Sequence, residues 1–176
     1  MATVIRGSDN FDTSDNATQT ELDALSTGKV LQVVQTTKND TTSSSSGSFT
    51  DISGMSVSIT PSSTSSKILV FYSVTIGGQT GMNNGLRLYR DSTSIAQGTG
   101  GISSNFEYTH FTRTAGNDLP RAYSMTVLDS PSTTSATTYK LQWRCEVGST
   151  TIYLNRRYDT GNIVTFSTIT AMEIAG

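Results

Sequence analysis

The residues that could carry out chemistry are few, and their spacing forms no catalytic set. Nucleophilic catalysis needs a Ser or Cys nucleophile, a His base and a carboxylate brought close together. The chain has one histidine, His110, and one cysteine, Cys145. It has no Gly-x-Ser-x-Gly segment of the kind that presents a nucleophilic Ser. We therefore expect a structural or surface role for His110 and a buried, unreactive position in the core for Cys145.

Hydrolysis of a glycan would need two placed carboxyl groups. Five carboxylates are available, but nothing in their spacing pairs any two of them: Asp91, Glu107, Asp118, Asp129 and Asp159. A metal site would have to combine His110 with Glu107, and one histidine with one carboxylate is a weak ligand set. We therefore predict a protein that is not an enzyme and that has no catalytic site, no metal site and no cofactor.

A binding surface is better supported than an active site. Aromatic and arginine side chains gather in two irregular stretches, and this mixture is typical of contact surfaces. The candidate contact residues are Tyr108, His110, Phe111, Arg113, Arg156, Arg157 and Tyr158. Two uses stay open, because the side chains could contact an external glycan or protein, or pack against a neighbouring subunit. We favour subunit packing, since symmetric oligomers bury many residues of this kind.

The composition indicates a β-rich chain with one core. Hydrophobic residues make up 34% and charged residues 15% of the chain, and the net charge is −2. So little positive charge argues against nucleic-acid binding through a basic face. Ser and Thr form about a third of the residues, but they accompany aromatic residues and short apolar runs, which favours strands over disorder. No segment approaches the ~18 apolar residues of a membrane span, so we expect no membrane insertion.

Alternation of apolar and polar residues predicts strands from residue 29 onward. Met55, Val57 and Ile59 alternate with Ser and Thr, as expected of a half-buried strand. Residues 139–147 are the cleanest case, since Tyr, Leu, Trp, Cys and Val face one way and polar residues the other. Residues 68–76 are apolar on both faces near their start, which predicts a central strand covered on both sides.

These patterns add up to about eight to ten strands and no convincing long helix. Between the strands we expect a Ser/Thr loop over residues 40–47, a glycine-rich turn over 77–85, and a last strand over 163–174. The predicted fold is all-β: residues 29–176 form an antiparallel two-sheet sandwich that is jelly-roll-like.

Residues 1–28 differ from the rest and are predicted to form a short N-terminal arm. Thr18 to Glu21 has the pattern of a capping box, and Gly28 is placed as a stop signal, which together predict one short helix. Two turns of helix are marginal alone, so we expect the arm to become ordered against a partner, in docking or oligomerisation. The candidate docking residues of the arm are Ile5, Phe11, Leu22 and Leu25.

Several stretches, taken in order, resemble a β-sandwich module found in tail-fibre and other virion proteins of tailed phages, including marine and cyanobacterial phages. The resemblance spans about residues 28–176 and is carried by Gly28-Lys-Val-Leu-Gln-Val-Val-Gln35, Val57-Ser-Ile-Thr-Pro-Ser-Ser-Thr-Ser-Ser-Lys-Ile-Leu-Val70, Leu86-Arg-Leu-Tyr-Arg-Asp91, Leu128-Asp-Ser-Pro-Ser-Thr-Thr-Ser-Ala-Thr-Thr-Tyr139 and Ser167-Thr-Ile-Thr-Ala-Met-Glu-Ile-Ala-Gly176. It implies a protein that is made in the host cytoplasm, lies on the virion surface and forms homo-oligomers, commonly trimers in fibres. It brings no catalytic motif with it.

Three functions follow from these expectations. The first is a trimeric tail-fibre or appendage subunit, with an arm that docks to other virion proteins and a β-domain that adsorbs to a host surface glycan or protein. The second is a capsid decoration protein (a cement or head-fibre protein), because we expect no large N-terminal anchor or extended shaft. The third is a small glycan-degrading tailspike enzyme, which release of reducing ends from host polysaccharide would support.

Overall fold

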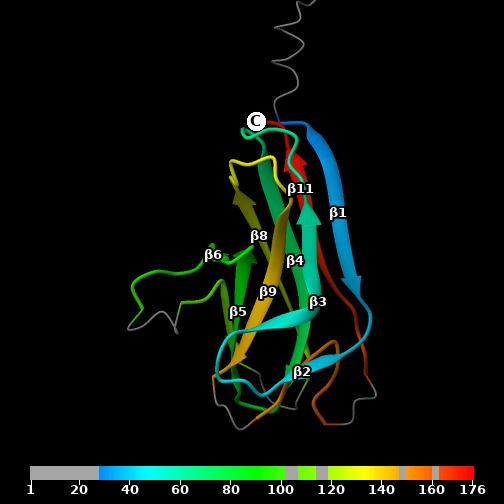
Figure 1. The fold of residues 1–176 in the computed structure, drawn as a ribbon. Coiled ribbons are helices and arrows are strands. Elements are labelled where there is room, and N and C mark those ends of the chain that lie inside the picture. The colour runs from blue at the N-terminus through cyan, green and yellow to red at the C-terminus, as the bar shows by residue number, and fades with distance from the viewer. Residues whose placement is uncertain (1–27, 102–106, 114–118, 147–149, 160–162) are drawn as a thin grey trace, which may run out of the picture.

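The structure is a computed structural model that describes residues 28–101, 107–113, 119–146, 150–159 and 163–176. Eleven strands in this part of the chain form two antiparallel sheets that face each other (Figure 1). The described residues contain no helix of the length and apolar character that crossing a membrane requires. Residues 1–27 of the predicted arm lie outside the described residues. They include the candidate docking residues Ile5, Phe11, Leu22 and Leu25.

The two sheets are named here after their central strands. The β4 sheet consists, in order across it, of β1 (Val30–Lys38), β11 (Ser167–Ile174), β4 (Lys67–Gly78) and β8 (Arg121–Asp129). Two short strands extend it beside the last residues of β4, namely β10 (Ile152–Leu154) and β2 (Thr42–Ser44). The β5 sheet consists of β3 (Thr50–Ile59), β9 (Thr137–Cys145) and β5 (Asn83–Arg90), with β6 (Thr93–Ile95) and β7 (His110–Arg113) along the far edge of β5.

The strand pairing is nested. β1 pairs with β11, β3 with β9, β4 with β8, and β5 with β6 and β7. The chain therefore folds like one long hairpin, and the hairpin is rolled up so that β11 also pairs with β4 and β9 with β5. This arrangement is a jelly roll, which confirms the predicted fold class.

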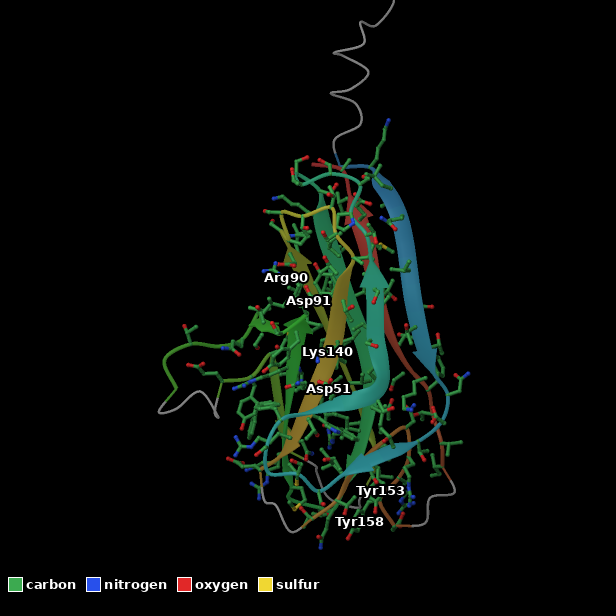
Figure 2. All side chains as sticks on the ribbon, viewed as in Figure 1. Asp51, Arg90, Asp91, Lys140, Tyr153 and Tyr158 are labelled. Carbon is green, nitrogen blue, oxygen red and sulfur yellow. The ribbon has the colours of Figure 1, made fainter. Side chains whose placement is uncertain are left out.

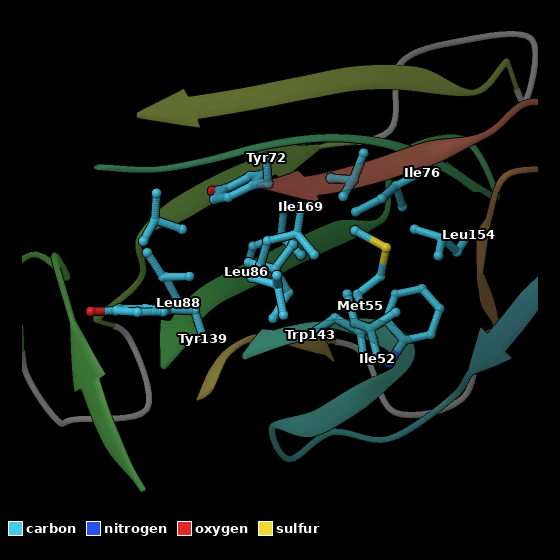
Figure 3. Packing of buried hydrophobic residues seen from close by; sticks show 14 of the residues in the cluster. Ile52, Met55, Tyr72, Ile76, Leu86, Leu88, Tyr139, Trp143, Leu154 and Ile169 are labelled. Carbon is cyan, nitrogen blue, oxygen red and sulfur yellow. The ribbon is translucent and has the colours of Figure 1, made fainter. Parts of the chain in front are cut away.

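The predicted alternation accounts for the core between the sheets (Figure 3). The residues expected to face inward on β3 and β9 are all buried, namely Met55, Val57, Ile59, Tyr139, Leu141, Trp143 and Cys145. The burial of Cys145 is as predicted. Full burial of a large apolar side chain stabilises the fold by roughly 1.5 to 3 kcal/mol, so this single face of β9 is a major source of stability.

Three loop and strand boundaries were predicted wrongly. The turn expected over residues 77–85 is shorter, because β4 continues to Gly78 and β5 begins at Asn83. The Ser/Thr loop over residues 40–47 contains β2. The last strand begins at Ser167. The strand count also exceeds the predicted eight to ten, because β2 and β6 are three residues long and too short to show alternation.

β4 is covered on one side only. Its inward side chains from Ile68 to Ile76 are buried, whereas Leu69 and Phe71 on the opposite face are only half-buried. The prediction that this strand is covered on both sides is therefore wrong for the described chain. The apolar residues that gave rise to the prediction lie on the outer surface of the β4 sheet.

Candidate functional site

The two ends of the sandwich differ in what they carry. At one end the backbone N–H of Gly28 donates to the Ala175 carbonyl oxygen over 2.8 Å, so the first described residue lies beside the last strand, β11, and the predicted arm would lead into the domain here (Figure 1). We call this the terminal end. At the opposite end residues 79–82 connect β4 to β5, and β10 lies beside the last residues of β4. We call this the turn end.

The first group of predicted contact residues, with the exception of His110, lies on the outer face of the β5 sheet, toward the turn end. Phe111 of β7 lies opposite Gly85, near the start of β5. The ring centroids of Tyr108 and Phe111 are 5.2 Å apart. Arg113 Nε donates to the Gly81 carbonyl oxygen of the β4–β5 turn over 3.2 Å. The structure thus brings Tyr108, Phe111 and Arg113 together.

Tyr108 packs directly on the sheet because Gly85 has no side chain. A Cβ atom on Gly85 would lie 1.9 Å from the Tyr108 ring. The Phe49 ring lies 5.6 Å from the Tyr108 ring, and the Arg87 guanidinium carbon stacks 4.0 Å above the Phe49 centroid. Arg144 Nη1 donates to the Tyr108 hydroxyl over 3.4 Å. We name this surface the platform; it consists of Phe49, Arg87, Tyr108, Phe111 and Arg144.

Three platform residues were not among the predicted contacts: Phe49, Arg87 and Arg144. A signal for two of them exists in the sequence. Arg87 lies between Leu86 and Leu88, so strand alternation places it on the outer face. Arg144 is one of the polar residues that the β9 pattern already assigned to the outer face. No local pattern marks Phe49, which reaches the platform from the loop before β3.

His110 faces away from the platform. It precedes Phe111 in β7 and therefore points to the inner side of the sheet. Its ring centroid lies 5.0 Å from that of Tyr123 on β8, so it packs between the two sheets at their edge. Burial lowers the pKa of His110, which favours the neutral imidazole at pH 7.

The second group of predicted contact residues surrounds Tyr153 of β10 at the turn end (Figure 2). The guanidinium carbon of Arg156 lies 4.3 Å from the Tyr153 ring centroid, and the Tyr158 ring lies 6.0 Å from the same ring. Arg157 Nε is paired with Asp159 Oδ1 at 2.7 Å. We name Tyr153, Arg156 and Tyr158 the β10 cluster. Tyr153 was not predicted as a contact residue, because its place in a short apolar strand gave no such signal.

The backbone of the β10 cluster is held against β4. A Cβ atom on Gly77 would lie 2.1 Å from the Arg156 carbonyl oxygen, so the loop can run this close only over a glycine. Arg156 also forms a β-bridge with Val164. The cluster is therefore fixed on two sides, as a contact surface with a defined shape requires.

The four candidate carboxylates that the structure describes are each held by a different partner. In the described part of the chain Asp91 accepts from Thr138, Glu107 from Gln97, Asp129 from Arg90, and Asp159 pairs with Arg157. Asp118 lies outside the described residues. Among the residues that the structure describes, no group of three His, Cys, Asp or Glu side chains could hold a metal ion.

Comparison with known proteins gives little beyond the fold described above. No family model matches the chain, and no curated protein matches it. One similar solved structure is the crystal structure of the infectious bursal disease virus VP2 subviral particle, with 16% identity and a TM-score of 0.37. Another is the structure of the infectious bursal disease virus Gx strain, with 14% identity and a TM-score of 0.39. Each comparison covers 82% of this chain but 37% of the other, and at these values nothing about those viruses is transferred to this chain.

Proposed function

We propose that the protein is a non-enzymatic structural subunit of a tailed-phage virion, and that it forms part of a tail fibre or similar appendage that adsorbs to the host. The resemblance of residues 28–176 to phage β-modules supplies the class of protein. The observation that carries the proposal is the placement of its surfaces. The arm joins the domain at the terminal end, whereas the platform and the β10 cluster lie toward the turn end.

This placement suits a domain that is attached at one end and adheres at the other. Aromatic and arginine side chains on a rigid surface contribute most to binding energy in protein interfaces. Phe111 is 49% exposed, so part of the platform is open to a partner. Close packing of Tyr108 on Gly85 and of the Arg156 backbone on Gly77 fixes these residues against the sheets, so that little conformational entropy is lost when a partner binds. A glycan or protein of the host surface fits this geometry better than a subunit packed beside the arm.

Locating the protein on the particle tests the proposed function most directly. Antibodies against the purified chain, used for gold labelling of virions of the encoding phage, are expected to label the tail or its fibres. Label over the capsid would contradict the appendage role and support the decoration protein that the sequence left as an alternative. Virions that take up no label under conditions that detect the purified chain would contradict the virion role altogether.

Adsorption can be tested with the purified protein as a competitor of the phage for host cells. Tyr158→Ala removes a ring of the β10 cluster and should weaken the competition about 30-fold, the effect of a loss of about 2 kcal/mol at an interface hot spot. Tyr89→Ala is the matched control, because Tyr89 is a half-buried tyrosine on the outer face of β5 toward the terminal end. Equal competition by both variants would contradict a receptor site at the turn end.

The non-enzymatic part of the proposal has its own measurement. The purified chain, incubated with polysaccharide of the host, is expected to release no reducing ends above the level of a heat-denatured sample. Release by the folded chain would support the glycan-degrading alternative.

A further inference from the structure

The outer face of the β4 sheet carries a row of apolar side chains that runs across four strands. Val33 of β1 lies opposite Met172 of β11, Met172 opposite Leu69 of β4, and Leu69 opposite Leu128 of β8. All four point away from the core, because their neighbours along each strand face inward. Val33 is 51% and Leu128 55% exposed, so the two ends of the row are open to solvent.

Further apolar residues adjoin this row on the same face. Val30 and Ile174 lie opposite each other one step toward the terminal end, and Val30 is 54% exposed. Phe71 lies one step toward the turn end, beside Thr170 and Thr126. We name the four residues of the row, together with Val30, Phe71 and Ile174, the apolar face.

Apart from Lys67, the rest of this surface is uncharged. The next rows toward the turn end hold Gln35, Thr170 and Thr126, and then Thr37, Thr168, Ser73 and Ser124. Gln35 Nε2 donates to Thr170 Oγ1 over 2.8 Å, so its amide lies along the sheet. Among the outward positions of these paired rows Lys67 is the single charged residue. By contrast, the outer face of the β5 sheet carries Arg87, Arg144 and the ion pair between Lys140 and Asp51.

We propose that the apolar face is the surface through which copies of this chain associate with one another. An identical partner presents the same charges, so a face rich in charges of one sign would repel its own copy. This face has almost no charged residues that would oppose the contact. The sequence of β4 agrees with such a contact. β4 carries apolar residues on both faces, as a strand does when both faces are covered. The described chain covers only the inner side, and a second copy would supply the missing cover.

The size of the face sets the strength of the contact. The three rows of the apolar face and the adjoining uncharged row of Thr37 and Ser124 lie about 7 Å apart on four strands about 4.8 Å apart, and together they span roughly 500 Å². Two such faces would bury roughly 1,000 Å² in total, which is the lower limit of a specific interface. We therefore expect association in the micromolar range. This inference rests on the proposed function, because it assumes an appendage built from several copies of the chain. The same face could serve a pair of copies or a ring of three around one axis.

The test is the oligomeric state of the full chain, measured by sedimentation or light scattering from roughly 1 to 100 µM. Leu128→Lys and Val33→Lys place a charge in the row at positions that are half exposed, so both variants should fold and melt like the original chain. Each should weaken association at least about ten-fold, because like charges then meet across the contact. Tyr89→Lys is the control, since Tyr89 lies on the outer face of the other sheet and belongs to none of the named surfaces, and this variant should associate normally.

The following results would each overturn the inference that copies associate through the apolar face. A full chain that stays monomeric over this range has no self-association face. An oligomer that is unchanged in Leu128→Lys and Val33→Lys uses another surface. A monomer that becomes oligomeric when residues 1–27 are deleted would show that the arm, and not a second copy, covers the face. Gold label on virion appendages together with a monomeric chain would retain the proposed function while overturning this inference.

Discussion

Arg90 of β5 and Asp129 of β8 join the two sheets near the terminal end of the sandwich. Arg90 Nη1 lies 2.8 Å from one carboxylate oxygen of Asp129 and 2.9 Å from the other. The hydroxyl of Tyr139, a fully buried residue of β9, donates to the same carboxylate over 2.7 Å. Burial, followed by the hydrogen bond to Asp129, raises the pKa of Tyr139, so the hydroxyl stays protonated and remains a donor.

Removal of this carboxylate should destabilise the domain strongly. Asp129→Ala would leave a half-buried guanidinium and a buried hydroxyl without their acceptor, and we expect a loss of about 3 kcal/mol in the free energy of unfolding. Asp51→Ala is the control, because Asp51 also pairs with a cation, Lys140, but its side chain is 53% exposed. That pair should contribute at most about 1 kcal/mol. Urea unfolding of both variants measures the difference, and equal losses would contradict the role assigned to Asp129.

Glu173 is a buried carboxylate whose hydrogen-bond donors are neutral. Its Oε1 accepts from the Ser62 backbone N–H over 2.7 Å and from the Ser62 hydroxyl over 2.6 Å, and its Oε2 accepts from Gln32 Nε2 over 2.6 Å. Burial by itself raises the pKa of Glu173, but the hydrogen bonds from Ser62 and Gln32 outweigh burial and lower the pKa from 4.5 to about 2. Folding therefore favours the ionised form.

This shift predicts acid sensitivity with a defined sign. Because the pKa is lower in the folded state, Glu173 stabilises the fold above about pH 4.5, and the contribution is lost as the pH falls from 4.5 toward 2. The loss is on the order of 3 kcal/mol. Glu173→Gln has no group that titrates here, so its free energy of unfolding should fall less between pH 5 and about pH 2.5. Parallel pH curves for the two proteins would contradict the assignment, since the other carboxylates titrate in both.

Asn155 ties three segments together at the turn end. Its Nδ2 donates to the backbone carbonyl oxygens of Lys38 and Asp40 over 2.8 and 3.0 Å, and its Oδ1 accepts from the Ser167 hydroxyl over 2.5 Å. Asn155 has a positive φ of 62°, a conformation that asparagine tolerates better than most residues. It therefore combines a tight backbone turn with a buried hydrogen-bond network.

Two substitutions separate these contributions. Asn155→Gly keeps the backbone conformation but loses the hydrogen bonds, and should destabilise the domain by about 2 to 3 kcal/mol. Asn155→Ala should cost about 1 kcal/mol more, because alanine is strained at positive φ. Ser132→Ala is the control for strain alone, since Ser132 is exposed and has a φ of 52°. If Asn155→Gly were as stable as the original chain, the network would contribute nothing.

The inward faces of the strands could be predicted from the sequence because burial with a period of two is a local property. Tyr139 to Cys145 of β9 shows this, because the structure buries every inward side chain of that stretch; Val147, which the pattern also placed inside, lies outside the described residues. Strand pairing could not be predicted in the same way. That Val33, Met172, Leu69 and Leu128 form one row depends on register between segments far apart in the chain, and alternation alone does not fix register.

The candidate site was predictable only in part, for the same reason. Tyr108 and Phe111 stood out as neighbours in sequence, but the contacts of Phe49 with Tyr108 and of Arg87 with Phe49 exist only because β5 pairs with β7 and the loop before β3 lies beside them. Tyr153 joins Arg156 because that loop folds back over Gly77. Close approach to a glycine leaves no mark in a single sequence, so these partners required the structure.

Gly77 allows a test of whether adsorption depends on the position of the β10 cluster as well as on its side chains. Gly77→Ala would place a Cβ atom 2.1 Å from the Arg156 carbonyl oxygen, so the backbone of the cluster must move although Tyr153, Arg156 and Tyr158 are all retained. We expect about ten-fold weaker competition with the phage for host cells, because an interface hot spot depends on fixed geometry. Gly98→Ala is the control, since nothing lies within 4 Å of a Cβ atom there.

Both glycine variants need a melting curve, so that displacement is distinguished from unfolding. Gly77→Ala should retain a cooperative transition, because the collision involves a surface loop and the core of β4 is untouched. If Gly77→Ala competes as well as Gly98→Ala while Tyr158→Ala does not, the ring alone provides the contact. In that case the close packing of the Arg156 backbone on β4 serves the stability of the fold and has no part in binding.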